Sequence, residues 1–195
     1  MNKGSIVITG ATGTLGSTFA IEMLEAGHDV YMPVRNLEKA KVFDQYPNAH
    51  YELANLEEYQ SMTGYFKHLS VQGITPTYVL LFAGDLRKDN DQMFPGSTKM
   101  AQEQHSIVYH ERVNVLTAQT TVSALKNVYA SQLSNIVLLG VSSWAARFES
   151  GHPYRINEEG YVLAKEKLSK LLIGWKGERI FKEVICEEPA FIISD

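Results

Sequence analysis

Tyr161 and Lys165 are the two residues of this sequence whose types and spacing most directly suggest chemistry. Residues four apart lie on one face of a helix, so the two side chains can act together. An ammonium group near a phenol favours the phenolate and lowers its pKa. Such a tyrosine can donate a proton to a carbonyl that is being reduced, or accept one from an alcohol that is being oxidised. With ten tyrosines and twelve lysines among 195 residues, chance supplies ~0.6 such pairs, so the pair needs support from a second feature.

That second feature is the glycine-rich segment Thr9-Gly10-Ala11-Thr12-Gly13-Thr14-Leu15-Gly16, which follows the apolar stretch 5–9. A loop that packs tightly against phosphates needs glycine, because a Cβ atom would hold the ligand away. The backbone N–H groups of the loop and the N-terminus of the next helix then face the negative charge. Glycines at a strand-to-helix junction therefore predict a dinucleotide-binding turn, and a tight turn without a ligand is the alternative.

The residue that follows the second predicted strand distinguishes NADP from NAD. An acidic residue there binds the ribose hydroxyls of NAD, whereas an arginine favours the extra phosphate of NADP. Arg35 stands nineteen residues after Gly16 (35 − 16), and no acidic residue follows it before Glu38. Its planar guanidinium can bind a phosphate and can stack on adenine. We therefore predict NADP in preference to NAD, and a solvated arginine at the end of the strand is the alternative.

Length and composition limit the class of protein. A chain of 195 residues can form one domain with a full core, and its 45% apolar and 21% charged residues are ordinary for a globular protein. The net charge of −4 gives no general attraction for nucleic acid, and no apolar run is long enough for a membrane span or a secretory signal. The single cysteine, Cys186, fits a reducing, cytoplasmic compartment, and the six histidines do not fall at metal-ligand spacings.

Strand and helix patterns alternate along the chain, which predicts a three-layer α/β fold. We expect a doubly wound parallel sheet of about six strands in a single Rossmann-type domain over 1–195. The strands are expected at 5–9, 29–34, 49–53, 78–82, 135–141 and 181–186. The helices are expected at 15–26, 37–46, 56–69, 99–130 and 158–175, with a loop over 85–96.

With the glycine segment and the Tyr–Lys pair in this order, the chain resembles the short-chain dehydrogenase/reductase superfamily over nearly all of its length. The spacing Thr-Gly-x-x-Gly-x-x-Gly, together with 27–30 and 34–36, is most similar to the extended and atypical branches, which include epimerase/dehydratase relatives. The resemblance implies an NADP-dependent oxidoreductase that transfers hydride between nicotinamide and a small carbonyl or alcohol substrate.

The resemblance also implies roles for the matching positions. Tyr161 would be the acid/base, and Lys165 would hold the nicotinamide ribose and tune the tyrosine. Ser143 would orient the substrate oxygen, with Ser142 the less favoured choice. Asn114 would belong to a proton relay, although a buried amide that bonds backbone fits it equally well. The positions expected to bind the cofactor are Gly10, Thr12, Gly13, Thr14, Leu15, Gly16, Arg35, Asn55, Ala83, Gly84, Lys165 and Pro189.

The sequence departs from the family pattern in places. Asn55 stands where an aspartate is usual near the adenine, and Phe82-Ala83-Gly84 replaces a common Asn-Ala-Gly. Because the chain ends at Asp195, we expect the substrate-binding C-terminal part to be short or missing. We also expect a homodimer through the helices at 99–130 and 158–175, with no nucleic-acid or membrane partner. Two alternatives stay open: an NAD(P)-binding sensor or scaffold without turnover, and an epimerase/dehydratase-type enzyme.

Overall fold

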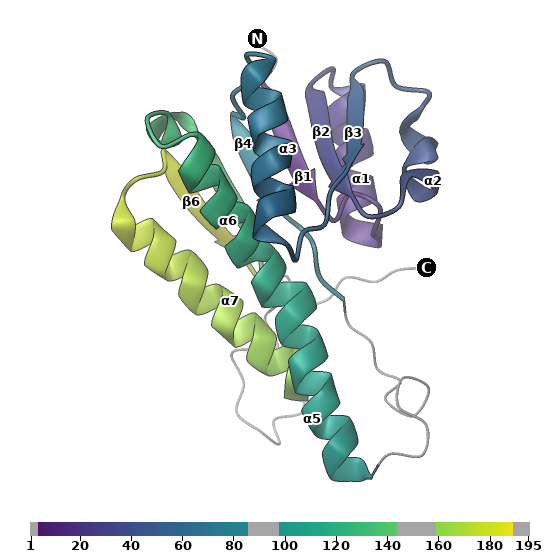
Figure 1. Ribbon diagram of the computed structural model, residues 1–195, viewed down its shortest axis with the longest axis vertical. Helices are drawn as coiled ribbons and strands as arrows, with labels where there is room; N and C mark the ends of the chain where they lie inside the picture. Colours follow the sequence, from purple (N-terminus) through teal and green to yellow (C-terminus); the bar gives the residue numbers. More distant parts are fainter. Residues whose placement is uncertain (1–3, 86–97, 144–158, 189–195) are drawn as a thin grey trace.

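The computed structural model describes residues 4–85, 98–143 and 159–188, and in these residues strands and helices alternate as the sequence predicts (Figure 1). The strands are β1 (Ser5–Thr9), β2 (Asp29–Val34), β3 (Ala49–Leu53), β4 (Tyr78–Leu81), β5 (Val137–Val141) and β6 (Glu183–Glu187). They form one parallel sheet in the order β3-β2-β1-β4-β5-β6. The order reverses direction between β1 and β4, and ligands of such sheets bind at the carboxyl ends of the strands beside this point. The predicted fold class is confirmed.

Helices cover both faces of the sheet (Figure 1). One face packs against α1 (Thr14–Glu25), α2 (Leu37–Ala40) and the short 3-10 helix η1 (Lys41–Phe43). The other face packs against α3 (Tyr59–Val71), α6 (Thr117–Val128) and α7 (Glu159–Glu178). The helix α5 (Lys99–His110) continues through the π-helical turn η2 (Glu111–Leu116) into α6 and lies against α7. None of the helices over the described residues combines the length and apolarity needed to cross a membrane.

The core follows from the alternation of side chains along the central strands. Val7 of β1 belongs to the cluster under α3, α6 and α7, whereas Ile6 and Ile8 belong to the cluster under α1. Successive side chains of a strand point to opposite faces, so a central parallel strand must be apolar at nearly every position. The same rule explains the continuous apolar run of β4. The central strands therefore pack against both layers of helices, and this packing fixes the positions of the carboxyl ends of the strands.

Two glycines allow α7 to approach its neighbours closely. A Cβ atom on Gly140 of β5 would lie 2.6 Å from the Cδ atoms of Leu172 on α7. A Cβ atom on Gly160, near the start of α7, would lie 2.7 Å from the backbone carbonyl carbon of Ser106 on α5. Both glycines bring α7 against the sheet and against α5. This packing places Tyr161 and Lys165 at the carboxyl ends of the strands.

Several boundaries differ from the expected ones. The helix expected at 37–46 is only α2 followed by η1, and the strand expected from residue 135 begins at Val137 because the 3-10 helix η3 (Leu133–Asn135) precedes it. The helix expected at 56–69 begins at Tyr59, because the N–H groups of Glu57 and Glu58 are bonded to Asn55 in a turn. The continuous helix expected at 99–130 is interrupted by η2.

Candidate functional site

The glycine segment forms the turn between β1 and α1. Gly10 has a φ of +72°, and a Cβ atom there would lie 2.6 Å from the backbone nitrogen of Ala83. A Cβ atom on Gly16 would lie 2.2 Å from the carbonyl oxygen of Gly10. Gly13 donates its N–H to the same carbonyl at 2.9 Å. Glycine is therefore required at 10 and 16 by the packing of the turn against the end of β4 and against the first turn of α1.

The start of α1 has the properties of an anion-binding site. Its N-cap is Gly13, which offers no side-chain hydrogen bond, and its first turn contains no acidic residue. Helix geometry leaves the first N–H groups, from Thr14 to Gly16, without intrahelical acceptors and concentrates positive charge there. The exposed Thr12 and Thr14 and the half-buried Leu15 border this helix end. The residues predicted to cradle a pyrophosphate are therefore together at the carboxyl end of β1.

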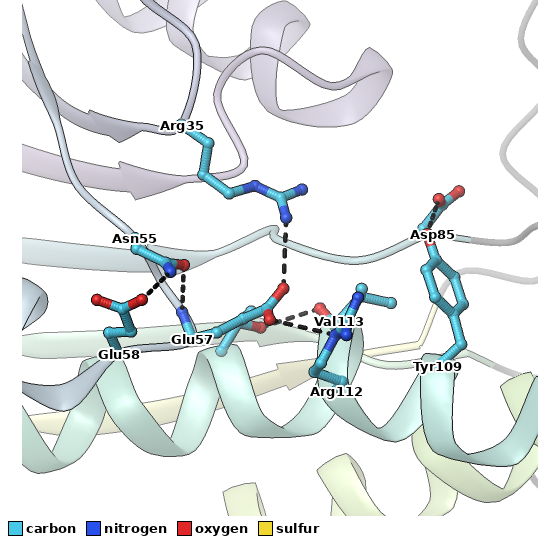
Figure 2. Close-up of polar contacts among 9 residues, drawn as sticks. Arg35, Asn55, Glu57, Glu58, Asp85, Tyr109, Arg112 and Val113 are labelled. Carbon is cyan, nitrogen blue, oxygen red and sulfur yellow. Dashed lines mark hydrogen bonds and ion pairs between the residues drawn. The ribbon is translucent and has the colours of Figure 1, made fainter. Parts of the chain in front are cut away.

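Arg35 and Asn55 line one cleft of about 510 Å³, whose walls are formed by Arg35, Leu53, Ala54, Asn55, Glu57, Ser61 and Arg112. Figure 2 shows the Arg35 side chain extending from the end of β2 toward Glu57, to which its Nη1 atom donates at 3.3 Å. Asn55 shapes the floor: its Oδ1 accepts the N–H of Glu57 at 3.1 Å and its Nδ2 donates to Glu58 at 2.7 Å. Asn55 therefore organises the turn after β3 beside the cleft.

Tyr161 and Lys165 meet Ser143 at the carboxyl end of β5. Burial raises the pKa of the Tyr161 phenol, and a side-chain hydrogen bond with Ser143 lowers it by a smaller amount. The Nζ atom of Lys165 lies 5.5 Å from the centre of the Tyr161 ring. The lysine alone was expected to lower the pKa of this tyrosine, and the structure shows the opposite direction because burial is the larger effect. The raised pKa therefore favours the protonated phenol.

Lys165 is a buried cation, with 6% of its surface exposed. Burial lowers the pKa of its ammonium to about 8, and the nearby Cys186 opposes this shift only partly. Nζ donates one hydrogen bond, to the carbonyl oxygen of Val141 at 3.1 Å. An ammonium group has three donors, so two remain for a ligand that approaches the end of β5. A lysine that is buried without an acidic partner is costly and is typical of functional sites.

Asn114 lies in η2, fully buried, with its Nδ2 bonded to the carbonyl oxygens of Asp85 and His110. Its Oδ1 is buried and has no hydrogen-bond partner. A Cβ atom on Gly84 would lie 2.5 Å from this Oδ1 and 3.5 Å from Nζ of Lys165. The amide nitrogen of Asn114 therefore bonds backbone, and its amide oxygen lies beside Gly84. Its part in a proton relay stays a prediction.

Three further residues, Ser142, His110 and Arg112, lie at the site, and the sequence singled out only Ser142 among them. Ser142, the less favoured serine, donates to the carbonyl oxygen of Lys165 at 2.8 Å and accepts from Ser169 at 2.7 Å, so it fixes α7 instead of facing Tyr161. His110 is buried with its ring centre 5.8 Å from that of Tyr161. Arg112 joins the cleft beside Arg35. Each of these contacts joins distant segments, and no local sequence signal marks them.

Two further predictions concern Pro189 as a cofactor-binding residue and the metal-ligand spacing of the histidines. Pro189 lies outside the described residues. Within residues 4–85, 98–143 and 159–188, no three His, Cys, Asp or Glu side chains gather as metal ligands would. The described residues that are predicted to bind the cofactor or to take part in catalysis all lie on the loops and helices that follow β1, β2, β3, β4 and β5.

An open parallel sheet with this strand order and a glycine turn after β1 defines a Rossmann-type dinucleotide-binding fold. No protein-family model matches the chain. Among curated proteins, it is similar to a dihydroflavonol 4-reductase of Hordeum vulgare, with 35% identity over 80 residues. The matched stretch covers 40% of this chain but only 22% of the reductase.

Solved structures resemble the whole described domain. A short-chain dehydrogenase from Streptomyces avermitilis aligns with 100% of this chain and 68% of its own, at a TM-score of 0.78 and 15% identity. A gluconate 5-dehydrogenase from Burkholderia cenocepacia, in complex with NADP and tartrate, aligns with 93% of this chain and 68% of its own, at a TM-score of 0.73 and 17% identity. The chain therefore has the fold of the short-chain dehydrogenases/reductases, as predicted.

Proposed function

We propose that this protein is an NADP-dependent oxidoreductase of the short-chain dehydrogenase/reductase type, which transfers hydride between nicotinamide and a small carbonyl or alcohol substrate. The observation that carries the proposal is the side-chain hydrogen bond between Ser143 and the half-buried Tyr161, with Lys165 on the next turn of α7. Ser143 and Tyr161 are eighteen residues apart (161 − 143), and their hydrogen bond at the end of β5 supports a shared role. Hydroxyl, phenol and ammonium groups at the switch point of such a sheet support carbonyl reduction better than a purely structural role.

The residues present fit a dinucleotide. The glycine turn leaves space that a Cβ on Gly10 or Gly16 would remove, and the start of α1 offers N–H groups without acidic competition. At the other end of the site, the unpartnered Oδ1 of Asn114 and the remaining donors of Lys165 suit a ribose, which carries hydroxyl groups that both donate and accept. When bound, the nicotinamide would supply or accept the hydride.

The protein side of the reaction then follows from the positions of the side chains. Ser143 would donate a hydrogen bond to the substrate oxygen and hold it next to the Tyr161 phenol. Tyr161, whose pKa is raised by burial, would give its proton to that oxygen as a carbonyl is reduced. Lys165 would stabilise the resulting phenolate with its positive charge. Asn114 would accept a hydrogen bond at Oδ1 from the ammonium or from water, through which the proton on Tyr161 is replaced.

We further propose that two copies of the chain associate through α5 and α7. Both helices expose large apolar side chains: Met100 and Val108 on α5, and Leu163 and Ile173 on α7. Exposed apolar residues on neighbouring helices support an interaction surface. We also propose a cytoplasmic location, because a sequence with one cysteine, Cys186, forms no internal disulfide and fits a reducing compartment.

The catalytic assignment is tested by oxidation of NADPH across a panel of aldehydes and ketones, with Tyr161→Phe beside the wild type. We expect the variant to keep NADPH binding and to lose ~10²-fold or more of turnover, because it lacks the transferred proton. Tyr59→Phe, at an exposed tyrosine of α3, is the matched control and should leave turnover unchanged. Equal turnover in Tyr161→Phe and the wild type would refute the assignment. Binding of NADPH without turnover of any carbonyl would favour the sensor alternative.

A further inference from the structure

Three charged side chains from three separate segments meet at the rim of the cleft beside Arg35 (Figure 2). Arg35 follows β2, Glu57 lies in the turn between β3 and α3, and Arg112 lies in η2. Oε1 of Glu57 accepts from Nη1 of Arg35 at 3.3 Å, and its Oε2 accepts from Nε of Arg112 at 3.2 Å. One carboxylate therefore bridges two guanidinium groups, one oxygen to each.

The turn that contains Glu57 fixes the position of its carboxylate, while the two arginine side chains are exposed to solvent. Only 19% of the Glu57 side chain is exposed, against 63% for Arg35 and 53% for Arg112. The backbone N–H of Glu57 is bonded to Asn55, whose own N–H donates to Ser61 at 2.9 Å, so the turn fixes the position of the carboxylate. Each arginine uses one of its five N–H donors in this bridge. The remaining donors are on the exposed side, toward the cleft.

Charge and stability point to a ligand for this arrangement. The two arginines and one glutamate carry a formal net charge of +1 at the rim of a chain whose net charge is −4. Exposed ion pairs of this kind add little to stability, so folding alone does not explain why three segments converge here. A phosphate monoester carries about −1.5 to −2 charges and three acceptor oxygens, enough to contact two guanidinium groups at once. Arginine binds such groups through two parallel hydrogen bonds.

We propose that Arg35 and Arg112 form a two-guanidinium clamp for the 2′-phosphate of the adenosine in NADP. Glu57 keeps the two guanidinium groups together and competes with that phosphate for them. The inference rests on the proposed function, because it gives Arg112 and Glu57 a part in the choice of cofactor. The apolar Leu53 and Ala54 line the same cleft and offer a surface for the adenine base. NAD lacks the phosphate and leaves the Glu57 bridge in place.

The clamp is tested by titration calorimetry of the full chain with NADP, NAD, 2′-AMP and 5′-AMP. Arg112→Gln should weaken binding of NADP and 2′-AMP about tenfold and leave NAD and 5′-AMP within about twofold of the wild type. Arg112→Lys keeps the charge but loses the planar guanidinium group, so its affinity for NADP should lie between those of the wild type and Arg112→Gln. Glu57→Gln removes the competing charge, and should tighten NADP and 2′-AMP about threefold without changing NAD. Thermal unfolding of each variant checks that it is folded.

The matched control is Lys176→Gln, which removes one exposed positive charge from the last turn of α7, next to the opposite edge of the sheet from β3. The clamp would be refuted, while the proposed function stood, if Arg112→Gln changed the affinities for NADP and NAD by the same factor, as is expected of this control. It would also be refuted if Glu57→Gln weakened the binding of NADP. If the wild type bound neither dinucleotide, the proposed function would fail. The clamp would then be judged on 2′-AMP against 5′-AMP and inorganic phosphate, and equal binding of these three would overturn it as well.

Discussion

Replacing Lys165 with methionine should make the protein more stable at neutral pH, although it removes a residue placed in the catalytic machinery. The ammonium group of Lys165 is buried, and burial lowers its pKa from 10.5 to about 8. The folded state therefore binds this proton less tightly than the unfolded state does. Methionine has a similar length and no charge, so Lys165→Met relieves the folded protein of that unfavourable burial.

The size of the effect follows from the pKa shift. A shift of one unit corresponds to about 1.4 kcal/mol, so a fall from 10.5 to about 8 corresponds to about 3 kcal/mol at pH values below 8. The substitution also removes the bond from Nζ to the Val141 carbonyl, which offsets about 1 kcal/mol. The expected net gain in the free energy of unfolding at pH 7 is therefore about 2 kcal/mol.

The sign of the pH dependence gives a second, independent readout. Between pH 8 and 10.5 the unfolded wild type binds more protons at Lys165 than the folded one, so wild-type stability rises with pH in that window. Lys165→Met lacks this contribution. Its advantage over the wild type should therefore shrink by about 2 kcal/mol between pH 7 and pH 9.5.

Urea denaturation of both proteins at pH 7, 8, 9 and 9.5 measures these quantities. Lys176→Met, at an exposed lysine in the last turn of the same helix, is the control and should show no comparable pH-dependent difference. The reasoning would be refuted if Lys165→Met were no more stable than the wild type at pH 7. It would equally fail if the difference between the two proteins stayed constant up to pH 9.5. Either result would mean that water or a reorganised environment already solvates the ammonium group.

Two other predictions concern the glycine turn and the association of chains. Gly16→Ala places a Cβ 2.2 Å from the Gly10 carbonyl oxygen, so it should lower the free energy of unfolding by about 2 kcal/mol or more and weaken NADPH binding. Gly64→Ala, which has open space around it on α3, should raise that free energy by about 0.5–1 kcal/mol. Thermal unfolding measures both changes. Light scattering at micromolar concentration should give twice the mass of one chain, and Val108→Glu on α5 should reduce it toward one chain. A monomeric wild type would contradict the proposed dimer.

The sheet could be predicted from the sequence because its signals are local. The strands β1, β2 and β3 have the predicted bounds. β1 and β2 are largely apolar, and the mixed strand β3 stands between Asn48 and Asn55. The end of the first helix also follows the sequence: Gly27 has a φ of +82° and accepts the left-handed conformation that closes α1. The alternation of strand and helix then fixes a parallel arrangement, and with it the edge at which the glycine turn and the Tyr161 helix meet.

The finer features of the site could not be predicted, because they depend on contacts across long sequence separations. The apolar pattern over 99–130 is the same for a continuous helix and for one with a π-helical turn, so nothing local marked η2. Glu57 and Arg112 are fifty-five residues apart (112 − 57) and meet only because α5 and η2 run beside the turn after β3. The direction of the Tyr161 pKa was missed for the same reason: its burial is a property of the packed site.

Three features that each cost stability belong to two elements, α7 and η2, and meet at one point. A charged lysine is buried on α7, the oxygen of a buried amide lacks a hydrogen-bond partner in η2, and η2 itself departs from α-helical geometry. They converge on Gly84, where a single added Cβ would contact both Asn114 and Lys165. Independent defects would be expected at separate places, and packing would remove them at little cost. Their meeting beside Ser143 and Tyr161, at the carboxyl ends of β4 and β5, is best explained by a ligand that bonds to the ammonium group and to the amide oxygen when it binds.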